Sequence, residues 1–260
     1  MTESDLDIEA LRAKGSGRLV GNRVLFYESL GSTMDEAGRL AERDEAEGTV
    51  VLAERQTRGR GRFDRRWTSP GGAGLLFSVV LRPNSVQLPF VNMAATLAVS
   101  SAIAEVTGLS TSIKWPNDVR VGGRKVSGIL IETAVESGEP RHAVLGVGIN
   151  VNLALGRFPE IAETATSLYR ETGQHVSRTA VLMAFLDRLD TLYGVVKAGE
   201  SLTQRWAAQL ETLGRSVTVR WGERVVEGQA FDVDDVGNLW VARPDGSSVK
   251  LLAGEVTSQV

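Results

Sequence analysis

The chain has 260 residues and a net charge of −3, which argues against a general nucleic-acid coat protein. It contains no cysteine and only two histidines, so a thiolate nucleophile, a disulfide framework and a multi-histidine zinc cluster are excluded or implausible. Five lysines stand against 24 arginines, and positive charge, backbone amides and carboxylates must therefore carry most of the chemistry.

Residues 1–20 are predicted to form a short, helical N-terminal stub. The segment begins with acidic residues and has no apolar core, so it does not resemble a secretory signal. Together with the absence of cysteine, this favours a cytoplasmic protein.

Residues 21–213 are predicted to form a mixed α/β catalytic domain. β-branched and aromatic residues bounded by turn formers predict strands over 24–27, 48–53, 75–81, 113–115, 125–134 and 143–151. Gly122-Gly123 and Glu136-Ser137-Gly138 are predicted to join neighbouring strands in hairpins. A helix is expected to begin at Ser177, where apolar residues recur every three or four positions, and another over 201–213.

One stretch, residues 83–104, is uncharged and long enough to cross a bilayer. It contains Asn84, Gln87, Pro89 and Asn92 together with several small residues. We therefore interpret it as a buried core helix and expect no membrane association.

Residues 214–260 have a different texture, with short alternating runs separated by glycine, aspartate and proline. The runs at 217–219, 225–226, 239–241 and 249–251 predict strands at close spacing. This pattern is typical of a small closed β-barrel domain.

The most unusual segment is 56–67, which reads QTRGRGRFDRRW. Glycines between arginines let the backbone approach a ligand, and guanidinium groups grip carboxylates and phosphates bidentately. A solvated basic loop or a nucleic-acid arm would have similar composition. Because the segment lies between two strands with buried character and ends in Trp67, a site for an anionic small ligand is the favoured interpretation.

Three further blocks could bear chemistry. KWPND at 114–118 and GGRKVSGIL at 122–130 contain two of the five lysines. These two lysines either bind a phosphate or carboxylate group, or they are solvated residues of a surface hairpin. Ser32 with Asp35 is an ordinary helix-capping pair, whose hydroxyls could also bind a polar group. GVGINVN at 146–152 predicts a buried strand closely approached by another group, and it lacks the third glycine of a dinucleotide fingerprint.

Taken in chain order, the four blocks resemble the biotin protein ligases. The family's features are a Ser-Thr turn, a Q-x-x-G-R-G-R-x-G-R-x-W loop, K-W-P-N-D, a G-x-K-x-x-G-I-L strand and G-[IV]-G-[IL]-N-V. The resemblance covers residues 22–152 by motif, and the C-terminal β-domain agrees in position. It implies an α+β fold, with a mixed-sheet, class II synthetase-like catalytic domain of the biotin/lipoate ligase type and a small C-terminal SH3-like β-barrel.

The resemblance also implies the activity. Such enzymes condense biotin with ATP, aided by Mg²⁺, to give biotinyl-5′-AMP, and then transfer biotin to one lysine of the acceptor (carboxyl carrier) domain of a biotin-dependent carboxylase. No enzyme nucleophile is needed, which suits a chain without cysteine. The implied partners are this acceptor domain and, in an arrangement the sequence allows, a second copy in a homodimer; DNA is not expected.

Roles follow by matching motif positions. The expected catalytic residues are Lys125, Arg60 and Arg62. Those implied for biotin binding are Ser32, Thr33, Met34, Gln56, Gly59, Arg60, Gly61, Arg62, Lys125 and Gly128. Those implied for ATP or the adenylate are Arg62, Arg65, Trp67, Asn117, Asp118, Lys125 and Asn150. Asp118 is also the candidate Mg²⁺ ligand.

Three features depart from the family pattern. Asp64 replaces the second loop glycine, and its charge could pair with an arginine and weaken phosphate contacts. Met34 replaces the asparagine of Ser-Thr-Asn, so a polar contact is lost. About 20 residues precede the first strand, too few for the helix-turn-helix domain of bifunctional members. We therefore expect a monofunctional ligase with altered affinity.

Alternatives remain open on the sequence alone. A lipoate–protein ligase would have a related fold, but the Arg-Gly loop and KWPND favour biotin. A nucleic-acid-binding module would show salt-sensitive binding that is independent of biotin. A catalytically weakened biotin sensor is suggested only by Asp64.

Overall fold

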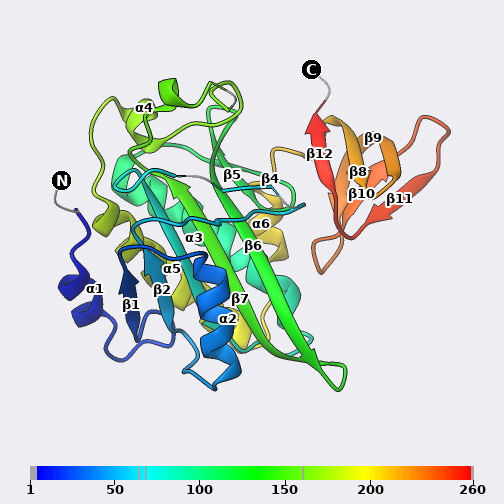
Figure 1. Ribbon diagram of the computed structural model, residues 1–260. Helices are drawn as coiled ribbons and strands as arrows, with labels where there is room; N and C mark the ends of the chain where they lie inside the picture. Colours follow the sequence, from blue (N-terminus) through cyan, green and yellow to red (C-terminus); the bar gives the residue numbers. More distant parts are fainter. Residues whose placement is uncertain (1–4, 64, 68, 160, 259–260) are drawn as a thin grey trace.

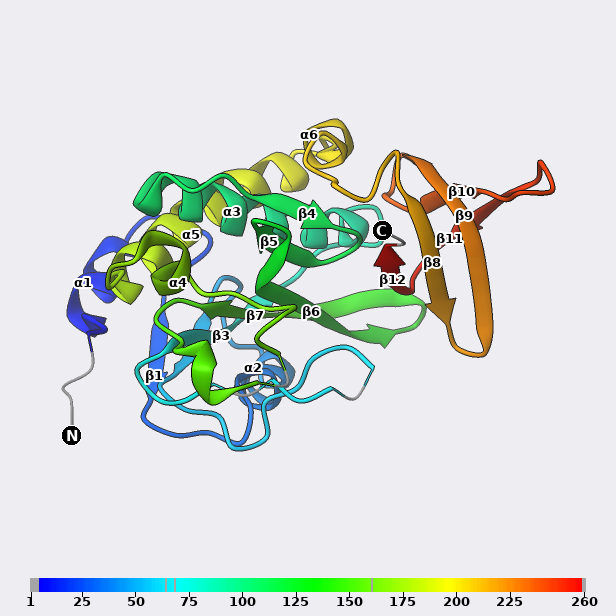
Figure 2. The same ribbon diagram turned by 90° about the horizontal axis from the view of Figure 1, so that it is seen from above.

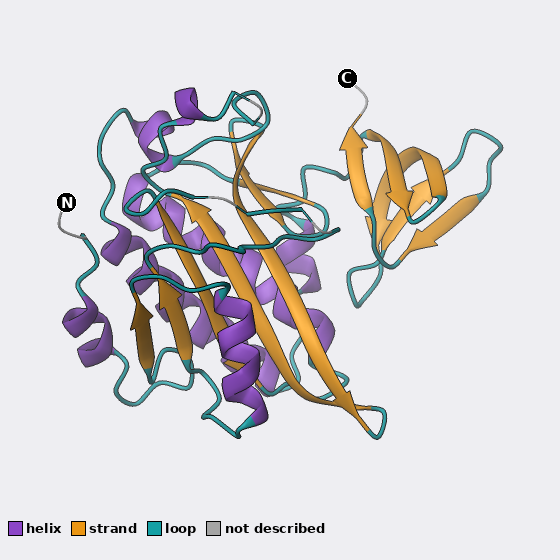
Figure 3. Ribbon diagram, in the orientation of Figure 1, coloured by secondary structure: helices purple, strands orange, loops and turns teal. Residues whose placement is uncertain are grey.

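The protein folds into a seven-stranded mixed sheet packed with helices and a smaller five-stranded sheet beside it (Figures 1 and 3). The computed structural model describes residues 5–63, 65–67, 69–159 and 161–258. Asp64 lies outside these residues, so its predicted effect stays a prediction. The arrangement confirms the predicted α+β class with an SH3-like C-terminal domain.

The large sheet has the strand order β1-β2-β3-β7-β6-β5-β4, in which only β1 and β2 are parallel. The long hairpin of β6 and β7 forms its centre. The strands are β1 (Val24–Tyr27), β2 (Val50–Ala53), β3 (Gly74–Leu81), β4 (Ser112–Lys114), β5 (Asp118–Val121), β6 (Arg124–Glu136) and β7 (Glu139–Asn150).

Helices cover both faces of this sheet. The long helices α3 and α5 pack against each other on one face, and α2 lies against β2, β3 and β7 on the other (Figure 1). The helices are α1 (Ile8–Lys14), α2 (Thr33–Glu42), α3 (Leu88–Thr107), the 3₁₀ turn η1 (Leu155–Arg157), α4 (Leu168–Thr172), α5 (Arg178–Lys197) and α6 (Thr203–Ala207). Ser177 caps α5 by accepting from the Ala180 backbone, as its sequence predicts.

The small sheet is antiparallel, with the order β11-β10-β9-β8-β12. Figure 2 shows it beside the end of the large sheet that carries β4. Its strands are β8 (Ser216–Trp221), β9 (Arg224–Val233), β10 (Leu239–Ala242), β11 (Ser248–Leu251) and β12 (Glu255–Ser258). The Trp115 indole donates to the Gly237 carbonyl (2.9 Å) and so ties the two sheets together.

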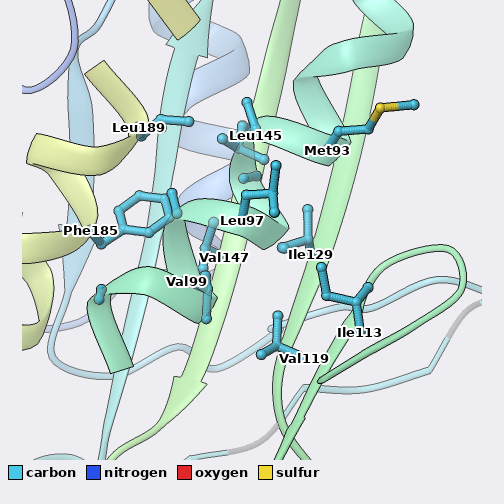
Figure 4. Packing of buried hydrophobic residues seen from close by; sticks show 14 of the residues in the cluster. Met93, Leu97, Val99, Ile113, Val119, Ile129, Leu145, Val147, Phe185 and Leu189 are labelled. Atoms are coloured by element: carbon cyan, nitrogen blue, oxygen red, sulfur yellow. The ribbon is translucent and has the colours of Figure 1, made fainter. Parts of the chain in front are cut away.

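The main core lies between the large sheet and the layer of α3 and α5 (Figure 4). Phe77 of β3 packs edge-on against Phe185 of α5, with ring centroids 5.0 Å apart. Within the described residues, α3 is the one helix long and apolar enough to cross a bilayer, but most of it is buried inside the protein. This burial supports its interpretation as a core helix.

Three sequence-based element predictions were incomplete. Gly122-Gly123 joins β6 to β5, a strand that was missed because KWPND places turn formers at its start. The helix expected over 201–213 ends at Ala207, because Gln209 and Glu211 form backbone hydrogen bonds with Ile113 of β4 instead. The strand β12 was also missed, and it pairs with β8.

A buried histidine in β7 makes stability depend on pH. His142 is 4% exposed, and burial, reinforced by Arg82 and Arg141, lowers its pKa. Since the unfolded chain takes up this proton near pH 6.5, the stabilisation is complete above that pH and is lost below it. We expect His142→Gln to flatten the slope of unfolding free energy between about pH 7 and 5, by at most ~1.4 kcal/mol per pH unit. Identical slopes in denaturant titrations would contradict this.

Candidate active site

A cavity of about 540 Å³ lies on the face of β6 and β7 opposite α3. Along these strands, side chains alternate between Ile129 and Val147, which are buried in the core layer, and Gly128 and Gly148, which face the cavity. The walls come from the start of α2, the 56–67 loop, the β4–β5 turn, residues 161–165 and the start of β12. All four sequence blocks therefore meet here.

Nearly every residue predicted for the site lines this cavity. The cavity residues among them are Ser32, Thr33, Met34, Gln56, Arg60, Gly61, Arg62, Arg65, Trp67, Asn117, Asp118, Lys125, Gly128 and Asn150. The exception, Gly59, is a buried residue of the loop, where a Cβ would collide with the Trp67 carbonyl and approach Gln56 Nε2 to 3.0 Å.

One end of the cavity carries a preorganised polar cluster at the N-terminus of α2. The Gln56 side-chain oxygen accepts from the Thr33 backbone (2.6 Å) and from the Thr33 hydroxyl (3.0 Å). The Ser78 hydroxyl donates to the Thr33 Oγ1 (2.8 Å), and Ser32 caps the helix. These bonds fix Thr33 and Gln56 in an environment suited to a small polar ring.

The cavity floor consists of glycines because large side chains occupy the space above it. A Cβ on Gly148 would overlap the Trp67 indole, and one on Gly128 would lie 3.0 Å from the same ring and 2.9 Å from Lys125 Nζ. A Cβ on Gly146 would overlap the Met34 thioether. Met34 is buried in an apolar cluster with Val51, Val80 and Val144. Its replacement of a polar residue thus adds apolar packing at this end.

At the other end of the cavity, backbone hydrogen bonds and an ion pair hold Lys125 in place. Its backbone bonds to Thr164 (2.9 Å) and Thr166 (2.8 Å), and its ammonium lies 2.6 Å from Asp118 Oδ1. The ammonium is also 5.5 Å from the centre of a Trp67 ring. The Lys125 ammonium therefore lies between Gly128 and Asp118, the first residue of β5.

Arg62 lies beside the β4–β5 turn, where its Nη1 donates to Asn117 Oδ1 (2.9 Å). Burial lowers the pKa of Arg62, and among the described residues Asp118 and Glu255 oppose this effect. Because this guanidinium is desolvated and bound to a neutral amide, an anionic ligand would stabilise its charged form strongly.

Arg60 and Arg65 are engaged with carboxylates. Arg60 forms hydrogen-bonded ion pairs with Asp35 and Glu132 (Nη2–Oε2 2.8 Å), which raise its pKa. Arg65 pairs with Glu255 of β12. The predicted ligand contacts of both guanidinium groups would require exchange of these partners, and they stay predictions.

The cavity residues that the sequence did not assign to the site include Ile161, Thr164 and Ala165 as well as the two groups that follow. Lys114 lines the cavity, and burial lowers its pKa; its membership of the sparse lysine set was the available signal. Gly254, Glu255 and Val256 reach the cavity from the small sheet. Their contribution depends on how the two sheets pack, which no local pattern encodes.

Asn150 helps to hold the cavity wall in place. Asn150 is buried and donates to the Thr166 carbonyl (3.0 Å), which ties β7 to the cavity wall.

Asp118 is the candidate Mg²⁺ ligand, and within the described residues no group of three or more acidic, histidine or cysteine side chains could hold a metal. A single carboxylate fits Mg²⁺, which commonly binds one protein carboxylate together with substrate phosphates and water.

Comparisons with known proteins agree with this geometry. Residues 27–150 match the biotin/lipoate A/B protein ligase family, and residues 212–257 match the biotin protein ligase C terminal domain. The biotin--[acetyl-CoA-carboxylase] ligase of Mycobacterium tuberculosis is 34% identical over 98% of both chains. The bifunctional ligase/repressor BirA of Bacillus subtilis is 33% identical, over 88% of this chain and 72% of the relative.

A solved structure is also similar. The biotin protein ligase from Aquifex aeolicus in complex with biotin and ATP is 32% identical and superposes with a TM-score of 0.76. The match covers 91% of this chain and 98% of that one.

Proposed function

This chain belongs to the biotin protein ligase family, and we propose that it activates biotin with ATP to biotinyl-5′-AMP and transfers biotin to a lysine of a biotin-dependent carboxylase. The proposed acceptor is the carboxyl carrier domain of that carboxylase. The protein is proposed to act in the cytoplasm.

The observation that carries the proposal is the pairing of two chemistries in one cavity. The neutral cluster of Thr33 and Gln56 suits the ureido ring of biotin, whereas Lys125, Arg62 and Lys114 suit carboxylate and phosphate groups. The glycines let Trp67 and Met34 lie close against β6 and β7, which leaves the rest of the cavity between the two ends for a flat ligand.

In the first step, the biotin carboxylate attacks the α-phosphorus of ATP and pyrophosphate leaves. Both reactants are anionic, so the protein must hold them together against their repulsion. Lys125 is placed to do this, because its ammonium can turn from Asp118 to oxygens of the carboxylate and α-phosphate. Desolvated Arg62 adds positive charge, and the apolar wall around Met34 helps exclude water.

Mg²⁺ would supply charge neutralisation on the phosphates, with Asp118 as the proposed protein ligand. In the second step, the acceptor lysine attacks the mixed anhydride and AMP leaves. Both nucleophiles thus belong to substrates. The protein contributes orientation and charge, which agrees with a cavity whose described lining includes neither cysteine nor histidine.

Biotin-dependent exchange of labelled pyrophosphate into ATP tests the first step. The purified protein should catalyse exchange with biotin and Mg²⁺, and it should not do so with lipoate in place of biotin. Exchange that depends on lipoate alone would support the lipoate-ligase alternative, and exchange with neither compound would refute activation chemistry.

A further inference from the structure

A fully buried arginine lies outside the cavity but is connected to the arginine-rich loop. Arg178 is the first residue of α5 and is 0% exposed. Its Nη1 donates to Glu54 Oε1 (2.9 Å) and to the Gly74 carbonyl (3.2 Å), and its Nη2 donates to Glu54 Oε2 (3.2 Å). Its Nε donates to Asp5. A buried guanidinium requires such partners, so their relative positions are strongly constrained.

These partners lie at both ends of the loop. Glu54 follows β2 and immediately precedes the arginine-rich segment, whereas Gly74 begins β3 after it. The Glu54 carboxylate also accepts from the Gly72 backbone. Arg178 and Glu54 therefore fasten the two ends of residues 55–73 to each other and to the start of α5.

The third partner comes from the N-terminal segment. Thr179 Oγ1 accepts from the Asp7 backbone (2.8 Å) and donates to the Asp5 carbonyl (2.9 Å). Leu6 and Leu11 are buried in the main core. These contacts hold the Asp5 carboxylate against Arg178, so the segment expected to be a mere stub contacts the loop support.

We propose that Arg178 is a positioning residue for the ligand-binding loop, and that the segment carrying Asp5 contributes to ligand affinity through it. The planar guanidinium fork can satisfy Glu54, Gly74 and Asp5 together only in one arrangement. Loosening it leaves the loop ends free to separate, so more conformational entropy is lost when the loop closes on a ligand. The inference rests on the proposed function for its ligand, biotinyl-5′-AMP.

The test uses the full chain with Arg178→Lys and Asp5→Asn. Arg178→Lys keeps the charge but loses the fork, and Asp5→Asn weakens the partner on the partly exposed side. Asp187→Asn is the matched control, because it breaks the ion pairs of Lys14 and Arg18 with α5 without touching the loop support. Hydrogen exchange of residues 55–63 and 69–74 is measured without ligand, and affinity for biotinyl-5′-AMP by titration.

We expect Arg178→Lys to accelerate exchange in these segments at least fivefold and to weaken affinity at least fivefold. Turnover at saturating substrate should stay within twofold of wild type, because the bound ligand orders the loop that carries Arg62 and Lys125 is untouched. Asp5→Asn should show the same pattern with a smaller amplitude, and Asp187→Asn should show neither effect. A lowered melting temperature with unchanged loop exchange and affinity would overturn the proposal. If wild-type protein fails to bind biotinyl-5′-AMP, the proposed function fails, while loop exchange still tests the role of Arg178.

Discussion

Replacing Lys125 with methionine should lower the rate of biotinyl-5′-AMP formation by at least tenfold, and by as much as ~10²–10³-fold if its charge acts mainly in the transition state. The ammonium lies at the cavity end that carries Arg62 and Asp118, where both reactants would bring negative charge. Methionine retains most of the side-chain volume and removes the charge. Single-turnover formation of the adenylate measures the effect.

Lys250→Met provides the control, because Lys250 pairs with Asp234 of the small sheet, outside the cavity. It should leave the adenylation rate unchanged within twofold. Both variants should unfold near the wild-type denaturant midpoint, since Lys125 is about one third exposed. Normal adenylation in Lys125→Met would show that its assigned role is wrong.

Gly148→Ala should be the most disruptive small substitution in the cavity. The new methyl group would overlap the Trp67 indole. The ring also packs closely over Gly128, so it would have to move away from the strands. Overpacking of this kind typically costs ~1–3 kcal/mol of stability. We also expect at least a tenfold loss of affinity for biotinyl-5′-AMP, because the displaced ring would enter the ligand space. Denaturant unfolding and ligand titration measure the two effects.

Two further variants isolate the cause. Gly38→Ala adds the same methyl group inside α2, where nothing lies within 4 Å, and it should stabilise the protein by ~0.5–1 kcal/mol. In a Trp67→Leu background, Gly148→Ala should lose most of its cost in stability. If its cost is the same in both backgrounds, contact with the indole is not the reason.

Local patterns predicted most of the large sheet because each strand carries its own signal. The run 24–27 became β1 with the expected bounds, and Ser177 capped α5 as expected. The failures share a physical cause. Residues 209–211 leave the helical pattern to bond with Ile113, about 100 positions earlier, and such long-range competition is not visible in a sequence window.

In the site too, local motifs predict some residues, whereas others depend on long-range contacts. The motif blocks identified the cavity lining on β6, β7 and the loop, because close packing of Trp67 and Met34 requires glycine at particular strand positions. Glu255 reaches the cavity only because the small sheet packs beside β4. Likewise, Arg178 contacts Glu54 across 124 positions of sequence. Contacts of this kind depend on tertiary packing and could not be derived from spacing.

Biotin transfer is tested by the intact mass of a recombinant carboxyl carrier domain after incubation with this protein, biotin and Mg-ATP. We expect the acceptor to gain the mass of one biotinyl group, and an acceptor with arginine at its target lysine to gain none. An unchanged acceptor mass, with no biotinyl-5′-AMP detected in the same reaction, would contradict the proposed function.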